Sequence, residues 1–294
     1  MKYLKLTLGT SIKNKTLFVL NMDAILARYG ELWLKSGWVK RQMQKMLAAN
    51  ISICLKRNKI KFDAIRTEQA GIVISTKDKK ALKILKNVFG ITSYSSVHVI
   101  EKDFDKIKEK ALELYKRARK NSTFRVTAKR ADKKFPIESQ TLAAKIGAYI
   151  IQKTGAKVKM KNADVDVQVK ISDRAYLYSE KILGAGGMPI GSQQRVLCIV
   201  RKKKELDACM KMMRRGCLVS IIRFGKCAIK KFEKEHYNCS EKLRVLKSKS
   251  RDEYAAAIDA AKEIGARAIV STDSIKKMAE ERQKHNFLML NPII

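Results

Sequence analysis

The chain has 294 residues, which is long for one compact domain and predicts two or three domains of about 100–200 residues each. Apolar residues make up 46% of the sequence and aromatic residues 7%, which is enough to build cores and excludes a disordered protein. There are 64 Lys and Arg against 28 Asp and Glu, a formal net charge of +36 spread over the whole length. Such an excess predicts a polyanionic partner such as RNA or DNA, and the alternative is a cell with a generally basic proteome.

Residues 1–21 form an N-terminal extension, either an extra strand or a stretch upstream of a start at Met22. Its apolar core is too short for a secretory signal. No part of the sequence approaches about 20 uninterrupted apolar residues, so we expect no membrane partner.

Residues 22–90 have the alternation of a ferredoxin-like domain. A helix is predicted after Gly37, with Leu47 and Ile51 on its apolar face and a polar face opposite. That polar face contains Lys40, Arg41, Gln44, Lys45, Lys56 and Arg57. The other predicted elements are strands at 24–28, 62–67 and 71–76 and a helix near 78–88.

Residues 91–183 form a second α/β unit. Asp103 is placed to cap its first helix. A basic strand, 124–130, runs into a loop closed by Pro136, and alternation puts Arg125, Thr127 and Lys129 on one side of that strand. A helix at 139–153 and two strands at 164–172 and 174–182 complete the unit.

Residues 184–194 are rich in glycine and predict a linker or a shaped loop. Beyond them, residues 195–294 alternate between apolar runs and helical patterns, which predicts a doubly wound parallel sheet. Ser250 and Glu253 are placed as a capping box for a helix at 251–264, and Gly265 ends it. The strand candidates are 196–200, 217–224, 242–249, 267–272 and 287–293.

The six cysteines, at 54, 198, 209, 217, 227 and 239, form no CxxC pair, and there are only three histidines. The sequence therefore predicts no metal site and no disulfide framework. Most of the cysteines stand in apolar runs, so we expect buried thiols in a reducing, cytoplasmic compartment.

Three segments together carry a family resemblance: ARYGELWLKSGWVKRQM (27–43), FRVTAKRADKKFPIESQTLAAKIGAYI (124–150) and GAGGMPIGSQQRVL (184–197). With MRRGC (213–217) behind them, the chain resembles archaeal and bacterial tRNA 4-thiouridine synthetases over about residues 22–294. The resemblance implies a ferredoxin-like domain, a THUMP domain and a PP-loop pyrophosphatase-like domain. It also implies binding of the tRNA acceptor end with its single-stranded CCA terminus.

The candidate RNA-binding residues are basic side chains that could neutralise phosphates. The first rank is the strand-and-loop set, Lys129, Arg130, Lys133 and Lys134. The second rank is Arg125, Lys40 and Arg41.

One departure from the family decides the chemistry that we expect. In the family, the first strand of the third domain runs into SGGxDS, whose glycines let backbone N–H groups wrap the ATP pyrophosphate. This chain has Val200, Arg201, Lys202, Lys203, Lys204 and Glu205 in those places. Side chains there disfavour the turn and fill the phosphate space, so ATP is not expected as a cofactor.

The family's catalytic cysteine lies downstream of the fifth strand, and no residue of this sequence occupies its position. The TGE-type turn of the family is replaced by Ser271, Thr272, Asp273 and Ser274. We therefore expect that the chain has no catalytic residue. We expect a tRNA-binding adaptor in tRNA modification, which forms a homodimer or pairs with an active enzyme. The alternatives are an ATP-dependent tRNA uridine sulfurtransferase completed by a partner chain and, more weakly, a general RNA chaperone.

Overall fold

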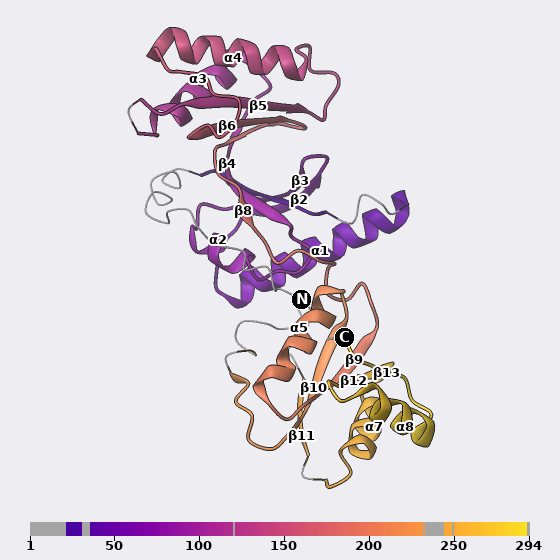
Figure 1. Cartoon of the computed structure of the whole chain (residues 1–294). Coiled ribbons are helices and arrows are strands. Elements are labelled where there is room, and N and C mark those ends of the chain that lie inside the picture. The colour runs from indigo at the N-terminus through magenta and orange to yellow at the C-terminus, as the bar shows by residue number, and fades with distance from the viewer. Residues whose placement is uncertain are drawn as a thin grey trace. The chain divides into compact units, whose positions relative to one another are not determined.

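The computed structural model describes residues 22–30, 36–119, 121–230, 232, 244–248 and 250–292 (Figure 1). The extension at 1–21 and Cys239 lie outside the described residues. The chain divides into two compact units. One contains the described residues of 22–24 and 96–180, and the other contains the described residues of 25–95 and 181–292.

The ferredoxin-like part forms as expected, with β2 and β3 as an antiparallel hairpin. Leu47, Ile51 and Leu55 of its long helix are buried, which confirms the apolar face. Gln44 is a correction, because it is buried and donates a hydrogen bond to the hydroxyl of Tyr29 rather than facing water. The elements are β1 (Ala24–Arg28), α1 (Gly37–Arg57), β2 (Ala64–Glu68), β3 (Gly71–Ser75), α2 (Lys80–Leu85) and β4 (Ser93–Ile100).

The THUMP part packs two helices against a sheet in which β5 and β6 are parallel and β6 and β7 antiparallel. Asp103 caps α3, its carboxylate accepting from the N–H of Lys106 at 2.9 Å, as the sequence predicts. Phe124 and Leu142 are fully buried in the core between helices and sheet. The elements are α3 (Phe104–Lys116), β5 (Phe124–Arg130), α4 (Ser139–Thr154), β6 (Val165–Ile171) and β7 (Ala175–Tyr178). The short strand that follows, β8 (Ile182–Leu183), pairs with the start of β4 in the other unit.

The C-terminal part is a five-stranded parallel sheet in the order β11-β10-β9-β12-β13, which confirms the doubly wound prediction. Its strands are β9 (Arg195–Val200), β10 (Leu218–Phe224), β11 (Val245–Ser248), β12 (Ala268–Val270) and β13 (Met289–Leu290). The helices among its described residues include the short η4 (Lys203–Glu205), α5 (Leu206–Arg214), α7 (Glu253–Glu263) and α8 (Ile275–His285).

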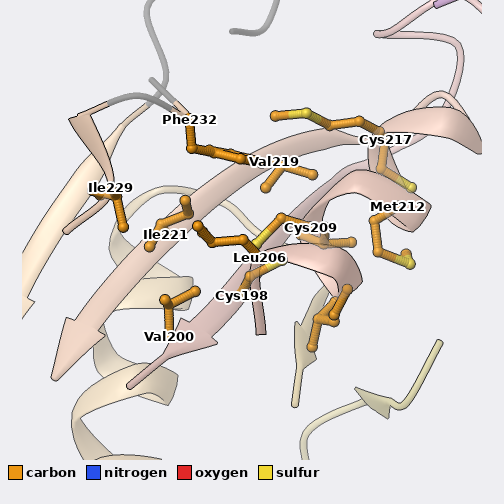
Figure 2. Packing of buried hydrophobic residues seen from close by; sticks show 14 of the residues in the cluster. Cys198, Val200, Leu206, Cys209, Met212, Cys217, Val219, Ile221, Ile229 and Phe232 are labelled. Carbon is orange, nitrogen blue, oxygen red and sulfur yellow. The ribbon is translucent and has the colours of Figure 1, made fainter. Parts of the chain in front are cut away.

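Both faces of this sheet are buried, as a parallel sheet requires. Alternate residues of β9 point to opposite faces: Cys198 and Val200 pack with α5, whereas Leu197 and Ile199 pack with α7. Figure 2 shows the first of these two clusters. The apolar run at residues 196–200 of β9 suits this double burial.

The glycine-rich segment is anchored by hydrogen bonds rather than hanging free. The N–H of Gly186 donates to Ile91 O at 2.8 Å, and the side-chain amide of Asn50 donates to Ile190 O at 2.9 Å. The N–H of Met188 donates to Arg214 O, at the end of α5, at 2.9 Å. The segment therefore joins the ferredoxin-like part to the C-terminal sheet.

The predicted capping box of α7 is wrong. Asp252, not Ser250, is the N-cap, and its carboxylate accepts from the N–H of Ala255 at 2.9 Å. An aspartate next to the first helical residue reaches that N–H directly. Among the described residues, no helix combines the length and apolar character needed to cross a membrane.

Candidate functional site

The candidate site lies where β9 and β12 end, at the centre of the parallel sheet. The strands are neighbours, with Cys198 aligned to Val270. The helix that follows β9 covers one face of the sheet, and the helices beside β12 cover the other. Open α/β sheets bind ligands at the carboxyl ends of the strands at such a reversal. Residues 201–205 and 271–273 follow these two strand ends.

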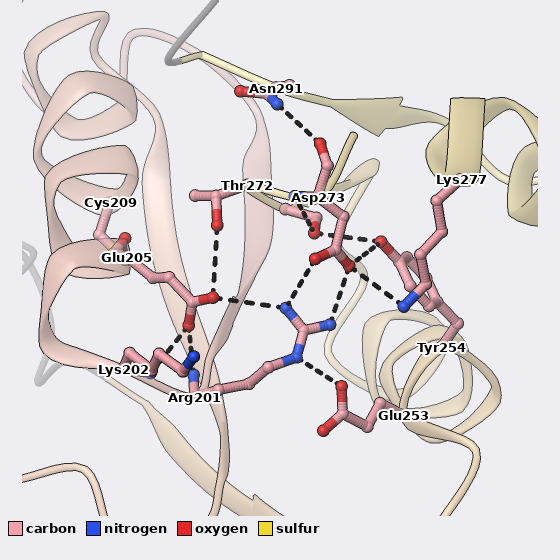
Figure 3. A network of polar contacts seen from close by, with 11 residues as sticks. Arg201, Lys202, Glu205, Cys209, Glu253, Tyr254, Thr272, Asp273, Lys277 and Asn291 are labelled. Carbon is pink, nitrogen blue, oxygen red and sulfur yellow. Dashed lines mark hydrogen bonds and ion pairs between the residues drawn. The ribbon is translucent and has the colours of Figure 1, made fainter. Parts of the chain in front are cut away.

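Arg201 is the centre of a polar network at this edge (Figure 3). Its guanidinium contacts three carboxylates, and only 19% of the side chain is exposed. Its Nη2 lies 3.0 Å from Asp273 Oδ2, its Nη1 lies 3.4 Å from Glu205 Oε1, and its Nε donates to Glu253. The network joins residues from η4, from the start of α7 and from the loop after β12.

Glu205 closes the loop that follows β9. Its carboxylate accepts from the backbone N–H of Arg201 and from that of Lys202, the latter at 2.9 Å. Thr272 Oγ1 adds a third donor at 3.3 Å, and Glu205 is only 5% exposed. The two N–H groups nearest the strand end are therefore bound to a carboxylate of the chain itself.

Asp273 is held from several directions. It accepts from the hydroxyl of Tyr254 at 2.8 Å, its own N–H donates to Ser271 Oγ at 3.2 Å, and Lys277 lies 3.7 Å away. Burial opposes the charge of Asp273, but the Tyr254 hydrogen bond and the charges of Arg201 and Lys277 outweigh it and lower the pKa of the carboxyl. Asp273 is therefore ionised at neutral pH.

The pKa values of two partners of Asp273, Tyr254 and Arg201, are raised. Burial, together with the bond to Asp273, raises the pKa of Tyr254 to about 12, so the phenol keeps its proton. Burial lowers the pKa of Arg201, but the Glu253 hydrogen bond and the surrounding carboxylates more than reverse this. Arg201 and Asp273 are therefore both charged at neutral pH, and Tyr254 is a neutral hydrogen-bond donor beside them.

The six residues at 200–205 do not act as one group. Val200 is buried in the apolar core, and Arg201 and Glu205 turn inward to the network. The side chains of Lys202, Lys203 and Lys204 are exposed. Glu253, Tyr254 and Asp273 belong to the network but were not predicted as site residues. The one available signal was the replacement of the TGE-type turn by a segment containing Asp273.

The candidate RNA-binding residues of the THUMP part divide by their contacts. Arg125 pairs with Asp166 and donates to Met160 O at 3.3 Å, and Arg130 donates to Phe135 O at 2.7 Å. These two arginines therefore help to hold the strand and its loop. Lys129, Lys133 and Lys134 are exposed.

The other two candidates lie in the first turns of α1. Arg41 is exposed, and Lys40 is partly buried.

The five described cysteines are buried, and two of them have a raised thiol pKa. Cys54, Cys198, Cys209, Cys217 and Cys227 are buried, and Figure 2 shows three of them inside the apolar cluster beside α5. A hydrogen bond with Cys209, burial and the neighbouring thiols raise the pKa of Cys198. Burial also raises the pKa of Cys217. Because the reactive species is the thiolate, the thiols of Cys198 and Cys217 are poor nucleophiles at neutral pH. In the described part of the chain, no three His, Cys, Asp or Glu side chains are grouped to hold a metal ion.

Two domain families match the chain. The ThiI ferredoxin-like domain matches residues 24–95, and the THUMP domain matches residues 101–180. Among curated relatives, a probable tRNA sulfurtransferase of Methanocaldococcus jannaschii is 31% identical, covering 95% of this chain and 86% of its own. Another, from Thermococcus kodakarensis, is 28% identical and covers 91% and 80%.

Two solved structures have a similar fold. PH1313 of Pyrococcus horikoshii has a TM-score of 0.81 at 27% identity, covering 93% of this chain and 95% of its own. A 4-thiouridine synthetase solved with RNA and bound ATP has a TM-score of 0.71 at 18% identity, covering 93% and 81%. The likeness to the second structure concerns the fold.

Proposed function

Because the chain belongs to the tRNA sulfurtransferase family, we propose that it binds the acceptor end of tRNA without activating it with ATP. It then serves in the cytoplasm as an adaptor that presents tRNA to a separate modifying enzyme, as a homodimer or as the partner of an active relative. Two parts of this proposal, the inactive nucleotide site and the RNA surface, rest on different residues.

The position of the Glu205 carboxylate carries the first part. A PP-loop site needs free backbone N–H groups after the first strand to wrap a pyrophosphate. Here the N–H groups of Arg201 and Lys202 are hydrogen-bonded to Glu205, so an internal carboxylate takes the place of the anion. A nucleotide would have to displace a buried ion pair as well as a hydrogen-bonded side chain.

The charge around the loop also opposes a triphosphate. Glu205, Glu253 and Asp273 place three carboxylates around the single guanidinium of Arg201. The Arg201 charge is matched from within and is not available to an incoming phosphate. Like charges at such short range disfavour a further polyanion by several kcal/mol in a partly buried site, on the order of the costs known for like-charge contacts. These residues do not fit ATP.

The exposed lysines of the THUMP part support RNA binding. Lys129, Lys133 and Lys134 follow one strand and its loop, and each presents its ammonium group to solvent. Phosphate neutralisation by such side chains gives affinity, while the unpaired bases of a single-stranded end supply selectivity.

The nucleotide part is tested with ATP and magnesium, using an intact tRNA sulfurtransferase as the positive control. We expect no thermal shift, no pyrophosphate release and no adenylated RNA from this chain. Pyrophosphate release by the purified chain would refute the adaptor role. Release only after a second protein is added would favour an active sulfurtransferase completed by a partner.

The RNA part is tested by comparing intact tRNA with tRNA that lacks the CCA end. We expect clearly weaker binding of the trimmed RNA and, for about five phosphate contacts, a slope of log K against log salt of about −3 to −5. Equal affinity for trimmed tRNA and generic hairpins would instead indicate a general RNA chaperone.

A further inference from the structure

A second basic feature lies in the C-terminal part, beside the end of α5. It is a hollow of about 440 Å³. Its lining residues are Gly187, Met188, Lys211, Arg214, Arg215 and Pro292. This surface was not among the sites predicted from the sequence, and it involves none of the residues of the Arg201 network.

The charge of the hollow is of one sign. Lys211, Arg214 and Arg215 are exposed, and no acidic side chain lines the hollow with them. Across residues 22–30, 36–119, 121–230, 232, 244–248 and 250–292, no hydrogen bond or ion pair engages any of these three side chains. This contrasts with Arg201, which is surrounded by carboxylates in the same part of the chain.

The glycine-rich segment shapes one wall of the hollow. Gly187 has φ +71°, and a Cβ on it would lie 2.2 Å from the carbonyl oxygen of Arg214. Only a residue without a side chain lets the backbone approach the last turn of α5 this closely. The close approach of the glycine-rich segment to Arg214 O therefore fixes this segment beside the three basic side chains.

The same approach satisfies backbone carbonyls at the carboxyl end of α5, whose partial negative charge would otherwise oppose an anion in the hollow. A helix carboxyl end is negative because its last carbonyls lack partners. Here the N–H of Arg215 donates to the carbonyls of Lys211 and Met212, at 3.2 and 3.1 Å. The carbonyls of Met213 and Arg214 accept from the N–H groups of Gly216 and Met188, both at 2.9 Å. With these carbonyls satisfied, the three cations dominate the hollow.

We propose that this hollow binds a backbone phosphate of the tRNA that the protein holds. The inference rests on the proposed tRNA binding and extends it to the C-terminal part of the chain. Two guanidinium groups and an ammonium suit a phosphate, since the forked arginine donors can bind two of its oxygens. The lining includes no aromatic side chain on which a base could stack, so a phosphodiester fits better than a free nucleotide.

The test uses the full chain and compares two triple variants with the same change in charge. The first is Lys211→Ala with Arg214→Ala and Arg215→Ala. The control is Lys262→Ala with Lys276→Ala and Arg282→Ala, three exposed side chains of α7 and α8. All six side chains are on the surface, and thermal melts establish that both variants fold.

The readout is tRNA affinity between about 50 and about 200 mM salt. We expect the hollow variant to bind roughly tenfold more weakly and its log–log salt slope to become shallower by about one. The control should keep the slope of the unaltered protein. Equal slopes in the two variants would overturn the inference while leaving tRNA binding intact. If the unaltered protein bound no tRNA, the proposed function itself would fail.

A second experiment distinguishes a phosphate of the RNA backbone from a phosphate of a free nucleotide. Inorganic phosphate and ATP are titrated against the unaltered protein and the hollow variant, with thermal shift as the readout. We expect no shift from ATP beyond that from inorganic phosphate. An ATP-specific shift that disappears in the hollow variant would assign the site to a free nucleotide and contradict the RNA assignment.

Discussion

Arg201 and Asp273 are 72 positions apart in the sequence, yet Nη2 of the Arg201 guanidinium lies 3.0 Å from Oδ2 of the Asp273 carboxylate. The first follows β9 and the second follows β12, which are adjacent in the sheet. The pair therefore spans the edge where this type of fold ordinarily admits a ligand. At this edge of the sheet, the Asp273 carboxylate and the Arg201 guanidinium bind each other.

We predict that Arg201→Met destabilises the protein by about 2–4 kcal/mol, because it leaves carboxylates crowded without their counter-ion. In a double-mutant cycle with Asp273→Asn, the two changes should be non-additive by about 1–2 kcal/mol. Urea unfolding measures both quantities. Additive losses would mean that the two side chains contribute independently.

Glu205→Gln should destabilise the protein by about 1–3 kcal/mol, since a buried carboxylate that satisfies two backbone N–H groups is lost. Asp207→Asn, at an exposed position two residues later, is the matched control and should change stability by less than about 0.5 kcal/mol. Similar effects of the two substitutions, measured by chemical denaturation, would contradict a structural role for the Glu205 carboxylate.

Gly187→Ala should destabilise the protein by about 2–4 kcal/mol, because its new methyl group meets the Arg214 carbonyl and its φ is positive. Gly265→Ala shares a positive φ of +67°, but nothing lies within 4 Å of the added Cβ. The control should therefore cost only about 1 kcal/mol, the penalty of the backbone conformation alone. The difference between the two in thermal unfolding isolates the close contact.

His98 should make the unit around residues 96–180 less stable in mild acid. Burial, followed by the charges of Lys110 and Arg117, lowers the pKa of His98 despite the opposing charges of Asp23 and Glu113. Arg117 Nη1 lies 3.1 Å from His98 Nε2, so a second ring proton would face a cation.

Because the pKa of His98 is lower in the folded than in the unfolded chain, the contribution of the neutral ring to stability is complete above pH 6.5, the ordinary pKa of histidine. That contribution is lost as the pH falls through the pKa of His98 in the folded protein. The ring titration by NMR should therefore fall below 6.5, and His98→Gln should flatten the decline in unfolding free energy between about pH 7 and 5. A ring that titrates at or above 6.5 would exclude this source of acid sensitivity.

Among the basic residues of the THUMP part, two different outcomes are expected. Replacing Lys129, Lys133 and Lys134 by Ala should weaken tRNA binding and make the salt slope shallower by about 2–3, with little change in melting temperature. Arg125→Ala should instead lower stability, because it removes the partner of Asp166. Anisotropy titrations and melts on the same samples distinguish these effects, and unchanged tRNA affinity of the triple variant would remove the lysines from the RNA surface.

The local patterns predicted the fold of the C-terminal part well. Apolar runs such as the one around Cys198 became parallel strands buried on both faces, because an uninterrupted apolar run suits that environment. The cap at Asp103 was also readable, since it depends on residues three positions apart. The cap of α7 was assigned to Ser250 instead of Asp252 because adjacent polar residues offer competing oxygens.

The contacts of the Arg201 network could not be predicted from local sequence patterns. Glu205 ends a run of lysines that looks solvent-exposed, and nothing local indicates that its carboxylate turns inward. Its partners Thr272 and Asp273 come from beyond another strand, so their contacts depend on the strand order. The lack of glycine at residues 200–205 is read directly from the sequence, whereas the hydrogen bonds of Glu205 to the backbone N–H groups of Arg201 and Lys202 are not.

The antiparallel pairing of β4 with β8 has a consequence for chain engineering. Ser93 is aligned with Leu183 and Tyr94 with Ile182, so the chain leaves the unit of residues 25–95 and re-enters it at neighbouring points. Everything between is topologically a cassette. A short turn joining these two strands would delete the intervening THUMP segment, and grafting a relative's segment between the same two strands would replace it.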